Sequence, residues 1–292
     1  MHEIVIISGK GGTGKTSLTG AFAHLASNKV ICDLDVDAPD LHLLLHPKNY
    51  RSEEFHSGYE AQIISEKCTG CGVCASMCRY DAVRNNGNGF SVDRLRCEGC
   101  KVCVEFCPEK AIDFPQKHCG HWYLSSTRFG PMVHAQIFPG EANSGRLVMI
   151  LKNRARELAK AFGKDLILCD GAPGIGCPVI SSLSGTNLAV AVTEPTPSGR
   201  HDLERVAELC SHFKVPFAVI INKYDLNHEE VDKIEAYCRL RGYPVIAKLP
   251  HVPVVTKAMV QGLVVTELPE TDFSLELRRT WLGIEELARF RR

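Results

Sequence analysis

Short apolar runs alternate with helical patterns near both ends of the chain. Residues 4–7 are apolar and largely β-branched, and Lys15–Ala26 then carries Leu18, Phe22 and Leu25 at helical spacing. Further buried strands are expected at 29–33, 166–169, 188–192, 217–221 and 245–247, with helices at 202–213 and 229–240. Apolar strands that alternate with helices predict an α/β fold, in which a mostly parallel sheet carries helices on both faces.

The middle of the chain breaks this rhythm. Between residues 57 and 116, cysteine, glycine and turn residues dominate, and no pattern of a core helix is visible. We therefore expect three segments: residues 1–56 and 117–292 form one main domain, and residues 57–116 form a small domain inserted into it. The polar stretch Lys48–Gly58 is the expected entrance to the insert and Pro115–Lys117 its exit, while the sheet pattern over 120–150 is weak.

Two cysteine runs of identical spacing lie within the expected insert, with their first cysteines 29 residues apart. Each run has the form C-x2-C-x2-C-x3-C, which is the ligand pattern of a ferredoxin with two clusters. The sequence therefore predicts a small α+β, bacterial-ferredoxin-like domain that holds two [4Fe–4S] clusters. Structural zinc is the alternative, but zinc sites usually pair two C-x2-C knuckles across a longer gap.

The fourth cysteine of each run is expected to cross to the cluster of the other run. Arg79 follows the fourth cysteine of the first run, whereas Pro108 follows that of the second, and neither residue ligates. One cluster is then assigned Cys68, Cys71, Cys74 and Cys107, and the other is assigned Cys97, Cys100, Cys103 and Cys78.

A phosphate-binding loop follows the first expected strand. Residues 9–16 match G-x-x-x-x-G-K-[ST] and lie between a strand and a helix, which is the context in which the motif binds nucleotides. Backbone N–H groups and the helix N-terminus attract phosphates there, Lys15 is expected at the β- and γ-phosphates, and Thr16 at Mg²⁺. The expected nucleotide contacts are Gly9, Lys10, Gly11, Gly12, Thr13, Gly14, Lys15, Thr16 and Ser17.

The loop with its additional Lys10 resembles the deviant Walker A motif of the MinD/ParA/Mrp group of P-loop ATPases. This resemblance implies a mostly parallel α/β fold and a homodimer that forms with ATP, in which Lys10 reaches the nucleotide of the partner. It also implies catalytic roles for Lys10 and Lys15. The resemblance begins with the loop and extends to motifs at the ends of later strands.

Four such motifs fit the same group. Asp33-Leu34-Asp35 resembles its switch I, which implies that Asp35 positions the attacking water; Asp37 is a rival for this role. Asp170-Gly-Ala-Pro-Gly resembles switch II, which implies that Asp170 holds Mg²⁺ through water. Asn222 and Pro250 lie where the group contacts the base. Because Asn222-Lys223-x-Asp also resembles the guanine-reading motif of GTPases, GTP remains an alternative to ATP.

The whole chain resembles MinD-superfamily ATPases that carry an inserted ferredoxin domain. The resemblance implies an ATP-binding and ATP-hydrolysing iron–sulfur protein that couples nucleotide-dependent dimerisation to electron transfer or metallocluster assembly. Its partner would be an unknown redox or cluster-acceptor protein. The alternatives are an iron–sulfur carrier or scaffold ATPase, a redox-sensing positioning ATPase and, more remotely, an amide-forming ligase on a related fold.

The amino-acid composition argues against nucleic-acid binding and membrane binding. The chain has 34 basic and 34 acidic residues, so no basic excess favours nucleic acid. No apolar run approaches the ~20 residues of a membrane span, and no targeting segment precedes residue 4, so a cytoplasmic protein is expected and membrane binding is not. Fourteen cysteines in a chain of this size without a secretion signal argue for thiolate ligands rather than a disulfide scaffold.

A few features stay open. Cys177, seven residues after the switch II aspartate, is interpreted as a buried or redox-active thiol rather than a ligand of a cluster between subunits, for which Cys119 would be the only second candidate. His118 and His121 could bind a metal, but such short tracts are more often part of a loop. The segment Phe273–Arg292 is expected to be a helix packed on the sheet rather than a membrane anchor.

Overall fold

The computed structural model describes residues 1–87, 89–141 and 145–290. The chain forms two compact units. The first contains Met1–Glu53, Trp122–Gln136 and Asn143–Arg292, and the second contains Glu54–His121 and Ile137–Ala142. The insert expected at 57–116 falls within the second unit.

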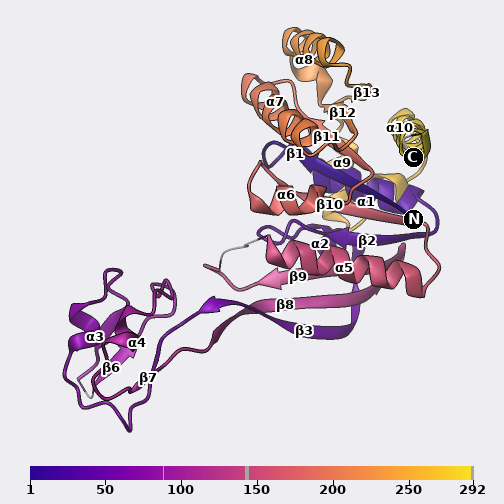
Figure 1. Ribbon diagram of the computed structural model, residues 1–292. Coiled ribbons are helices and arrows are strands. Elements are labelled where there is room, and N and C mark those ends of the chain that lie inside the picture. Colours follow the sequence, from indigo (N-terminus) through magenta and orange to yellow (C-terminus); the bar gives the residue numbers. More distant parts are fainter. Residues whose placement is uncertain (88, 142–144, 291–292) are drawn as a thin grey trace. The chain divides into compact units, whose positions relative to one another are not determined.

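A nine-stranded sheet forms the centre of the first unit (Figure 1). Neighbouring strands are parallel from β13 through β9. A helix precedes β2, β10, β11, β12 and β13, which is the crossover that parallel pairing needs. The order across the sheet is β13 (Val245–Leu249), β12 (Phe217–Asn222), β11 (Leu188–Thr193), β1 (His2–Ser8), β10 (Leu166–Pro173), β2 (Lys29–Asp33), β9 (Gly130–Ile137), β8 (Gln116–Thr127) and β3 (Lys48–Tyr59).

Helices cover both faces of this sheet, as the sequence predicts (Figure 1). One face carries α1 (Lys15–Leu25), α2 (Leu41–Leu45), α9 (Pro253–Val260) and α10 (Asp272–Phe290), together with the 3₁₀ turn η2 (Val265–Glu267). The other face carries α5 (Arg146–Ala161), α6 (Cys177–Leu183) and α7 (Pro197–His212), with α8 (His228–Arg241) against α7 and the 3₁₀ turn η1 (Tyr224–Leu226) before it.

Helix α10 packs on the sheet, as expected, over the part of the chain that the structure describes. Leu277, Trp281 and Ile284 are buried, and the Trp281 ring lies 5.5 Å from that of Phe22. Each such side chain stabilises the fold by about 1.5–3 kcal/mol. Residues 291–292 of the expected helix lie outside the described residues, and no described helix is long and apolar enough to cross a membrane.

The second unit contains two short antiparallel pairs and two short helices. β4 (Gln62–Ile63) pairs with β7 (Ile112–Asp113), and β5 (Val83–Asn85) pairs with β6 (Phe90–Val92). α3 (Val73–Ser76) and α4 (Val102–Glu105) lie against each other at equivalent positions of the cysteine repeat. With four residues each, these helices are too short to give the periodic pattern by which a helix is predicted.

Two elements of the sheet domain differ from the sequence interpretation. The polar stretch expected as an entrance to the insert is the strand β3, in which only Phe55 is fully buried. Its position as the last strand of the sheet explains why its side chains carry no apolar alternation. Helix α5 was not predicted, although Leu147, Leu151 and Leu158 lie along its buried face.

Candidate functional site

The carboxyl ends of the parallel strands bring the expected nucleotide residues together. In the register of β2 and β10, Asp33 lies beside Asp170. Thr193 and Asn222 end the strands β11 and β12 on the other side of β1. Because parallel strands all end at the same edge of a sheet, residues far apart in sequence meet where the phosphate loop leaves β1.

The phosphate loop, residues 9–16, joins β1 to α1 and needs glycine at two crowded positions. Gly14 has a φ of 91°, and a Cβ there would lie 2.5 Å from the Nδ2 atom of Asn222. A Cβ on Gly9 would lie 2.4 Å from the Cβ of Asp202. Both distances are too short for side-chain atoms. Any residue other than glycine at either position would therefore displace the loop, and with it the N–H groups that bind phosphate before α1.

Lys15 lies at the centre of a buried charge cluster. Its Nζ atom is 3.0 Å from Asp170 Oδ1 and 3.2 Å from Asp35 Oδ2. Burial lowers the pKa of Lys15, but the carboxylates of Asp170 and Asp35 outweigh it and leave the pKa raised. The hydroxyls of Thr16 and Thr19 each donate a hydrogen bond of 2.8 Å to Asp170, which fixes both oxygens of that carboxylate.

A third carboxylate completes the cluster. Asp33 is buried, and its Oδ1 accepts a hydrogen bond from the backbone N–H of Asp35 at 3.1 Å, whereas its Oδ2 has no partner among the described residues. Burial, followed by the nearby Asp170, raises the pKa of Asp33 well above its ordinary value. Three carboxylates around one lysine, one of them with an unsatisfied oxygen, suit a hard divalent cation. Asp37, the rival of Asp35, is exposed.

Lys10 lies outside this cluster and contacts its own chain. Its Nζ atom is 2.7 Å from Glu194 Oε1 and within 3.2 Å of the hydroxyls of Thr196 and Ser198 at the start of α7. Lys223 approaches the other oxygen of Glu194 at 3.1 Å and donates to the Gly12 carbonyl at 2.9 Å. Glu194 therefore holds two lysines beside the phosphate loop.

The residues expected near the base have different environments. The Nδ2 of Asn222 donates to the Thr13 carbonyl at 2.8 Å, so this buried amide supports the phosphate loop. Pro250 directly follows β13, and the next N–H, that of His251, donates to Asp225 Oδ1 at 2.6 Å. Ser17 Oγ lies 3.3 Å from Met259 Sδ on α9.

The cysteines of the two runs line two separate cavities in the second unit. The first is lined by Cys68, Cys71, Cys74 and Cys107, and the second by Cys78, Cys97, Cys100 and Cys103. In each cavity three sulfurs come from one run and the fourth from the other, which is the grouping expected from the spacing.

The donor set of these cavities fits iron–sulfur clusters. Four cysteines per cavity match the four thiolate ligands of a cubane, and the walls are otherwise mostly apolar. Cys71 and Cys100 are exposed at their cavities. Burial, with Cys97 and Cys100 as the next causes, raises the pKa of the Cys103 thiol to about 11, so a bound metal must displace its proton.

The other two singled-out cysteines, Cys119 and Cys177, differ in exposure. Cys119 is buried, and its thiol donates to the Ser57 carbonyl at 3.3 Å. Burial raises the pKa of this thiol. Cys177 is exposed at the first residue of α6, so it is not a buried thiol, and its redox role stays a prediction.

A family model for the CobQ/CobB/MinD/ParA nucleotide-binding domain matches residues 4–265, which is most of the chain. The chain belongs to this family. A relative in Methanocaldococcus jannaschii, the uncharacterized protein MJ0578, is 35% identical over 231 residues, which cover 77% of this chain and 79% of the relative. A second relative in that organism, MJ0579, is 25% identical over 281 residues, which cover 82% of this chain and 91% of the relative.

Solved MinD structures share the fold of this CobQ/CobB/MinD/ParA family member. The cell division ATPase MinD of Pyrococcus furiosus has a TM-score of 0.60 and 18% identity, with 98% of this chain and 99% of MinD covered. The Pyrococcus horikoshii septum site-determining protein MinD, solved with Mg-ADP, has the same score and identity and covers 100% of this chain and 98% of its own.

Two residues of the site in this family member, Glu194 and Thr19, were not predicted from the sequence. Glu194 was not singled out, although it follows β11 at the same edge as the phosphate loop. Thr19 was missed because its hydroxyl faces Asp170 from the second turn of α1, outside the loop motif. Glu194 carries a usable signal, since a charged residue directly after a buried parallel strand marks a ligand-facing edge.

Proposed function

We propose that this chain is an ATP-binding and ATP-hydrolysing iron–sulfur protein that couples nucleotide-dependent dimerisation to electron transfer or metallocluster assembly. The observation that carries the proposal is the grouping of eight cysteines around two cavities in a chain that also has the phosphate loop and acidic cluster. The phosphate loop and acidic cluster support nucleotide hydrolysis, and the cysteine cavities support iron–sulfur chemistry. Their presence in one chain supports a protein that has both.

In the nucleotide site, Lys15 would bind the β- and γ-phosphates. The loop N–H groups would contact phosphate oxygens, together with the Thr13 hydroxyl, which has no partner among the described residues. Thr16 and Asp170, already joined by a hydrogen bond, would hold Mg²⁺ directly and through water. The Mg-ADP bound to the P. horikoshii MinD supports this assignment. Asp35, buried beside Lys15, would position the attacking water better than the exposed Asp37.

In the second unit, residues 57–116 would form a ferredoxin-like domain whose cysteines each hold iron. A [4Fe–4S] cluster supplies one-electron redox chemistry at a potential that nearby hydrogen bonds and exposure adjust. The chain's own contribution is to group the sulfurs, to exclude water with apolar walls, and to donate backbone N–H groups to Cys78 and Cys107 at 3.3 Å.

The dimer part of the proposal concerns Lys10. Its ammonium is held by Glu194 within one chain, at a side-chain exposure of 28%. A partially exposed ion pair is weak, so the γ-phosphate of a partner's nucleotide would be a competitive acceptor for Lys10. ATP would then join two subunits, and hydrolysis would release them.

A cluster carrier is the second candidate, because Cys71 and Cys100 are exposed at the two cavities. Ligands that are accessible to solvent are also accessible to the thiols of an acceptor protein. Incubation of the loaded protein with an apo-ferredoxin distinguishes the two roles. Retention of both clusters supports electron transfer, and their loss to the acceptor supports the carrier.

Anaerobic purification with iron, sulfide and EPR analysis tests the proposal. We expect about eight irons and eight sulfides per chain, as two cubane clusters require. The variant Cys177→Ser, which alters an exposed cysteine outside the runs, is the control and should keep full iron content. Stoichiometric zinc with little iron would overturn the cluster assignment.

A further inference from the structure

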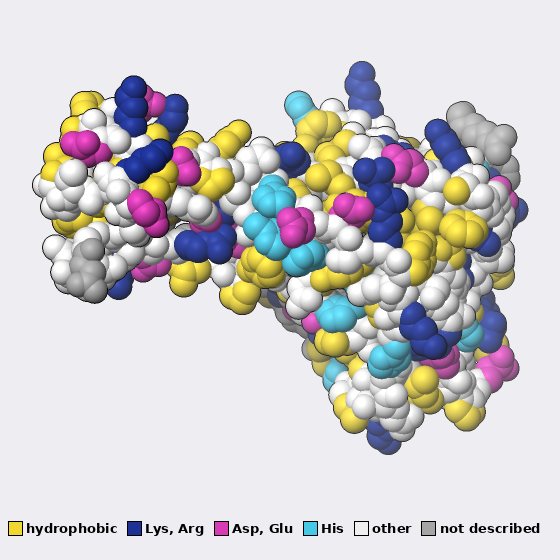
Figure 2. Space-filling model, turned by 90° about the horizontal axis from the view of Figure 1, so that it is seen from below, with side chains coloured by type: hydrophobic (Ala, Val, Ile, Leu, Met, Phe, Trp, Pro, Cys, Tyr) yellow, Lys and Arg dark blue, Asp and Glu magenta, His cyan; other side chains and the backbone are white. Residues whose placement is uncertain are grey.

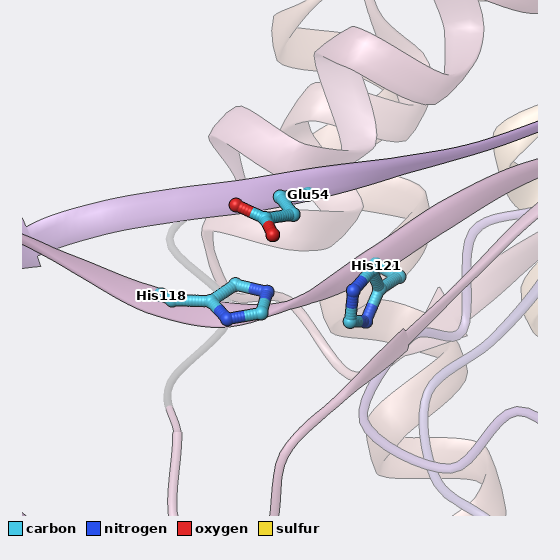
Figure 3. Close-up of side chains that lie close together, drawn as sticks. All are labelled: Glu54, His118 and His121. Atoms are coloured by element: carbon cyan, nitrogen blue, oxygen red, sulfur yellow. The ribbon is translucent and has the colours of Figure 1, made fainter.

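Three potential metal ligands meet in the second unit, outside the two cysteine cavities. Glu54 lies on β3, and His118 and His121 lie on β8 (Figure 3). One ligand atom from each residue lies within 4.8 Å of the others. Figure 3 shows the carboxylate of Glu54 pointing toward the two rings.

The backbone of β8 is unusual between the two histidines. Residues i and i+3 of a regular strand face opposite sides of the sheet. Gly120 has a φ of 152°, in the region that favours glycine, and both Cys119 and Gly120 are buried. The rings of His118 and His121 nevertheless lie 4.8 Å apart, and the unusual backbone of Gly120 lies between these two residues in the chain.

A hydrogen bond leaves one nitrogen of the His118 ring available as a metal ligand. The Nε2 of His118 lies 3.0 Å from the carbonyl oxygen of Gly120, and a carbonyl can only accept. The proton is therefore on Nε2, and Nδ1 keeps the lone pair that a metal needs. Metal-bound histidines commonly have this arrangement, with the second nitrogen donating to a backbone carbonyl.

A fourth potential metal ligand, His56, lies beside these three residues. The ring of His56 is stacked on that of His118 at 5.1 Å between centroids, and its Nε2 is 3.5 Å from Glu54 Oε2. His121 lies edge-on to His118 at 4.8 Å. Figure 2 shows histidine side chains grouped beside acidic ones on the molecular surface.

We propose that Glu54, His118 and His121 bind a divalent transition-metal ion, with Zn²⁺ as the representative, and that His56 is placed to be a fourth ligand. Donor atoms around a tetrahedral zinc are about 3.4 Å apart, given zinc–ligand distances of about 2.0–2.2 Å. The donor atoms, which lie within 4.8 Å of one another, would have to approach to this distance when the ion binds. Two imidazoles and one carboxylate are borderline ligands, unlike the thiolates of the cysteine runs.

This metal site is independent of the proposed function, because it shares no ligand with the cysteine cavities. It lies on the strands β3 and β8, each of which has residues in both units. A bound ion would cross-link the two strands through side chains from both. The site is therefore expected to stabilise the paired segments 54–56 and 118–121 as well as to hold the metal.

Zinc binding to the anaerobically prepared full-length protein tests this site. The protein is dialysed against Zn²⁺, and bound zinc and iron are measured together with the zinc K-edge absorption spectrum. We expect one zinc per chain in addition to the iron, with nitrogen and oxygen neighbours at about 2.0–2.2 Å and the outer scattering of imidazole. Zinc whose neighbours are sulfur at about 2.3 Å, or no retained zinc, would overturn the proposal.

Variants assign the ligands. His118→Ala and His121→Ala should each weaken zinc binding more than about 100-fold, because loss of a ligand exceeds the cost of losing an outer partner. His212→Ala, which alters an exposed histidine at the end of α7, should bind zinc as the wild type does. Unchanged iron content shows that the second unit is intact in each variant. Wild-type zinc affinity in both ligand variants would contradict the assignment.

Discussion

Cys78 and Cys107 occupy the same position in the two cysteine repeats, and each lines the cavity of the opposite run. Each sulfur also accepts a hydrogen bond of 3.3 Å from the N–H four residues later, that of Ala82 or Ala111. The local turn is thus the same in both repeats, although Arg79 follows one cysteine and Pro108 the other. The placement of the fourth cysteine in the cavity of the other run is therefore common to both repeats.

The crossed grouping predicts which cysteine variants behave alike. Cys78→Ser and Cys97→Ser should damage the same cluster, and Cys107→Ser and Cys68→Ser the other, because each pair lines one cavity. Each variant should keep about half of the wild-type iron, and EPR spectra of the reduced protein should fall into these two pairs. A Cys78→Ser spectrum that instead matched Cys68→Ser would contradict the crossed assignment.

The buried charge cluster predicts separate effects on nucleotide binding and hydrolysis. Lys15→Ala should weaken nucleotide binding about 10–100-fold, because it removes charged hydrogen bonds worth about 1.5–3 kcal/mol. Asp35→Asn should leave binding within a few-fold and lower the ATPase rate about 10²–10⁴-fold, since it removes the group that orients water. Calorimetry and phosphate release measure the two quantities.

Asp37→Asn is the matched control for Asp35→Asn, because Asp37 follows two residues later and is exposed. It should keep most of the ATPase rate. If Asp37→Asn lost turnover while Asp35→Asn kept it, the assignment of the water-positioning role would be wrong.

The Lys10–Glu194 ion pair predicts that loss of Lys10 affects dimerisation rather than nucleotide binding. Lys10→Ala should abolish ATP-dependent dimerisation while each subunit still binds nucleotide, because Lys10 lies outside the Lys15 cluster. Sedimentation velocity with a non-hydrolysable ATP analogue measures this, with exposed Lys214→Ala as the control. A Lys10→Ala protein that dimerises like the wild type would exclude a role across the interface.

His134 predicts that acid destabilises the first unit. Burial, aided by the nearby His42, lowers the pKa of His134 to about 4, and its Nε2 is 3.0 Å from Ser125 Oγ. The unfolded chain, with a pKa near 6.5, binds the proton first as pH falls. The free energy of unfolding therefore falls as the pH is lowered from about 6.5 to about 4. At pH 5 it has fallen by about 2 kcal/mol.

Urea unfolding at pH 7 and pH 5, in wild type and His134→Gln, measures this loss. The glutamine side chain keeps polar atoms near Ser125 but does not titrate in this range. The variant should lose about 2 kcal/mol less than the wild type between the two pH values. Equal losses in both proteins would show that His134 is not the titrating group.

The parts of the fold that follow from sequence are those with buried, periodic side chains. The runs in β1 and β2 are fully enclosed, so their apolar character is visible without the structure. Strand β3 lacks this signal, because its backbone pairs at one edge of the sheet while most of its side chains face solvent. Helix α5 did carry a signal, with Leu147, Leu151 and Leu158 at helical spacing.

The candidate sites also differ in whether the sequence predicts them. Asp33 and Asp170 could be placed together because both end parallel strands, and topology alone makes such ends neighbours. Glu54 and His118 are 64 positions apart, and their meeting depends on the pairing of β3 with β8 and on the unusual backbone of Gly120. Neither property can be read from composition or spacing.

If nucleotide state and cluster state are coupled, a redox titration of the loaded protein detects the coupling. Midpoint potentials are measured without nucleotide, with ADP and with a non-hydrolysable ATP analogue, and nucleotide affinity is measured for the oxidised and reduced protein. We predict that at least one midpoint shifts with nucleotide and that affinity changes by the same free energy, about 59 mV for each tenfold. Identical midpoints together with identical affinities would contradict the account.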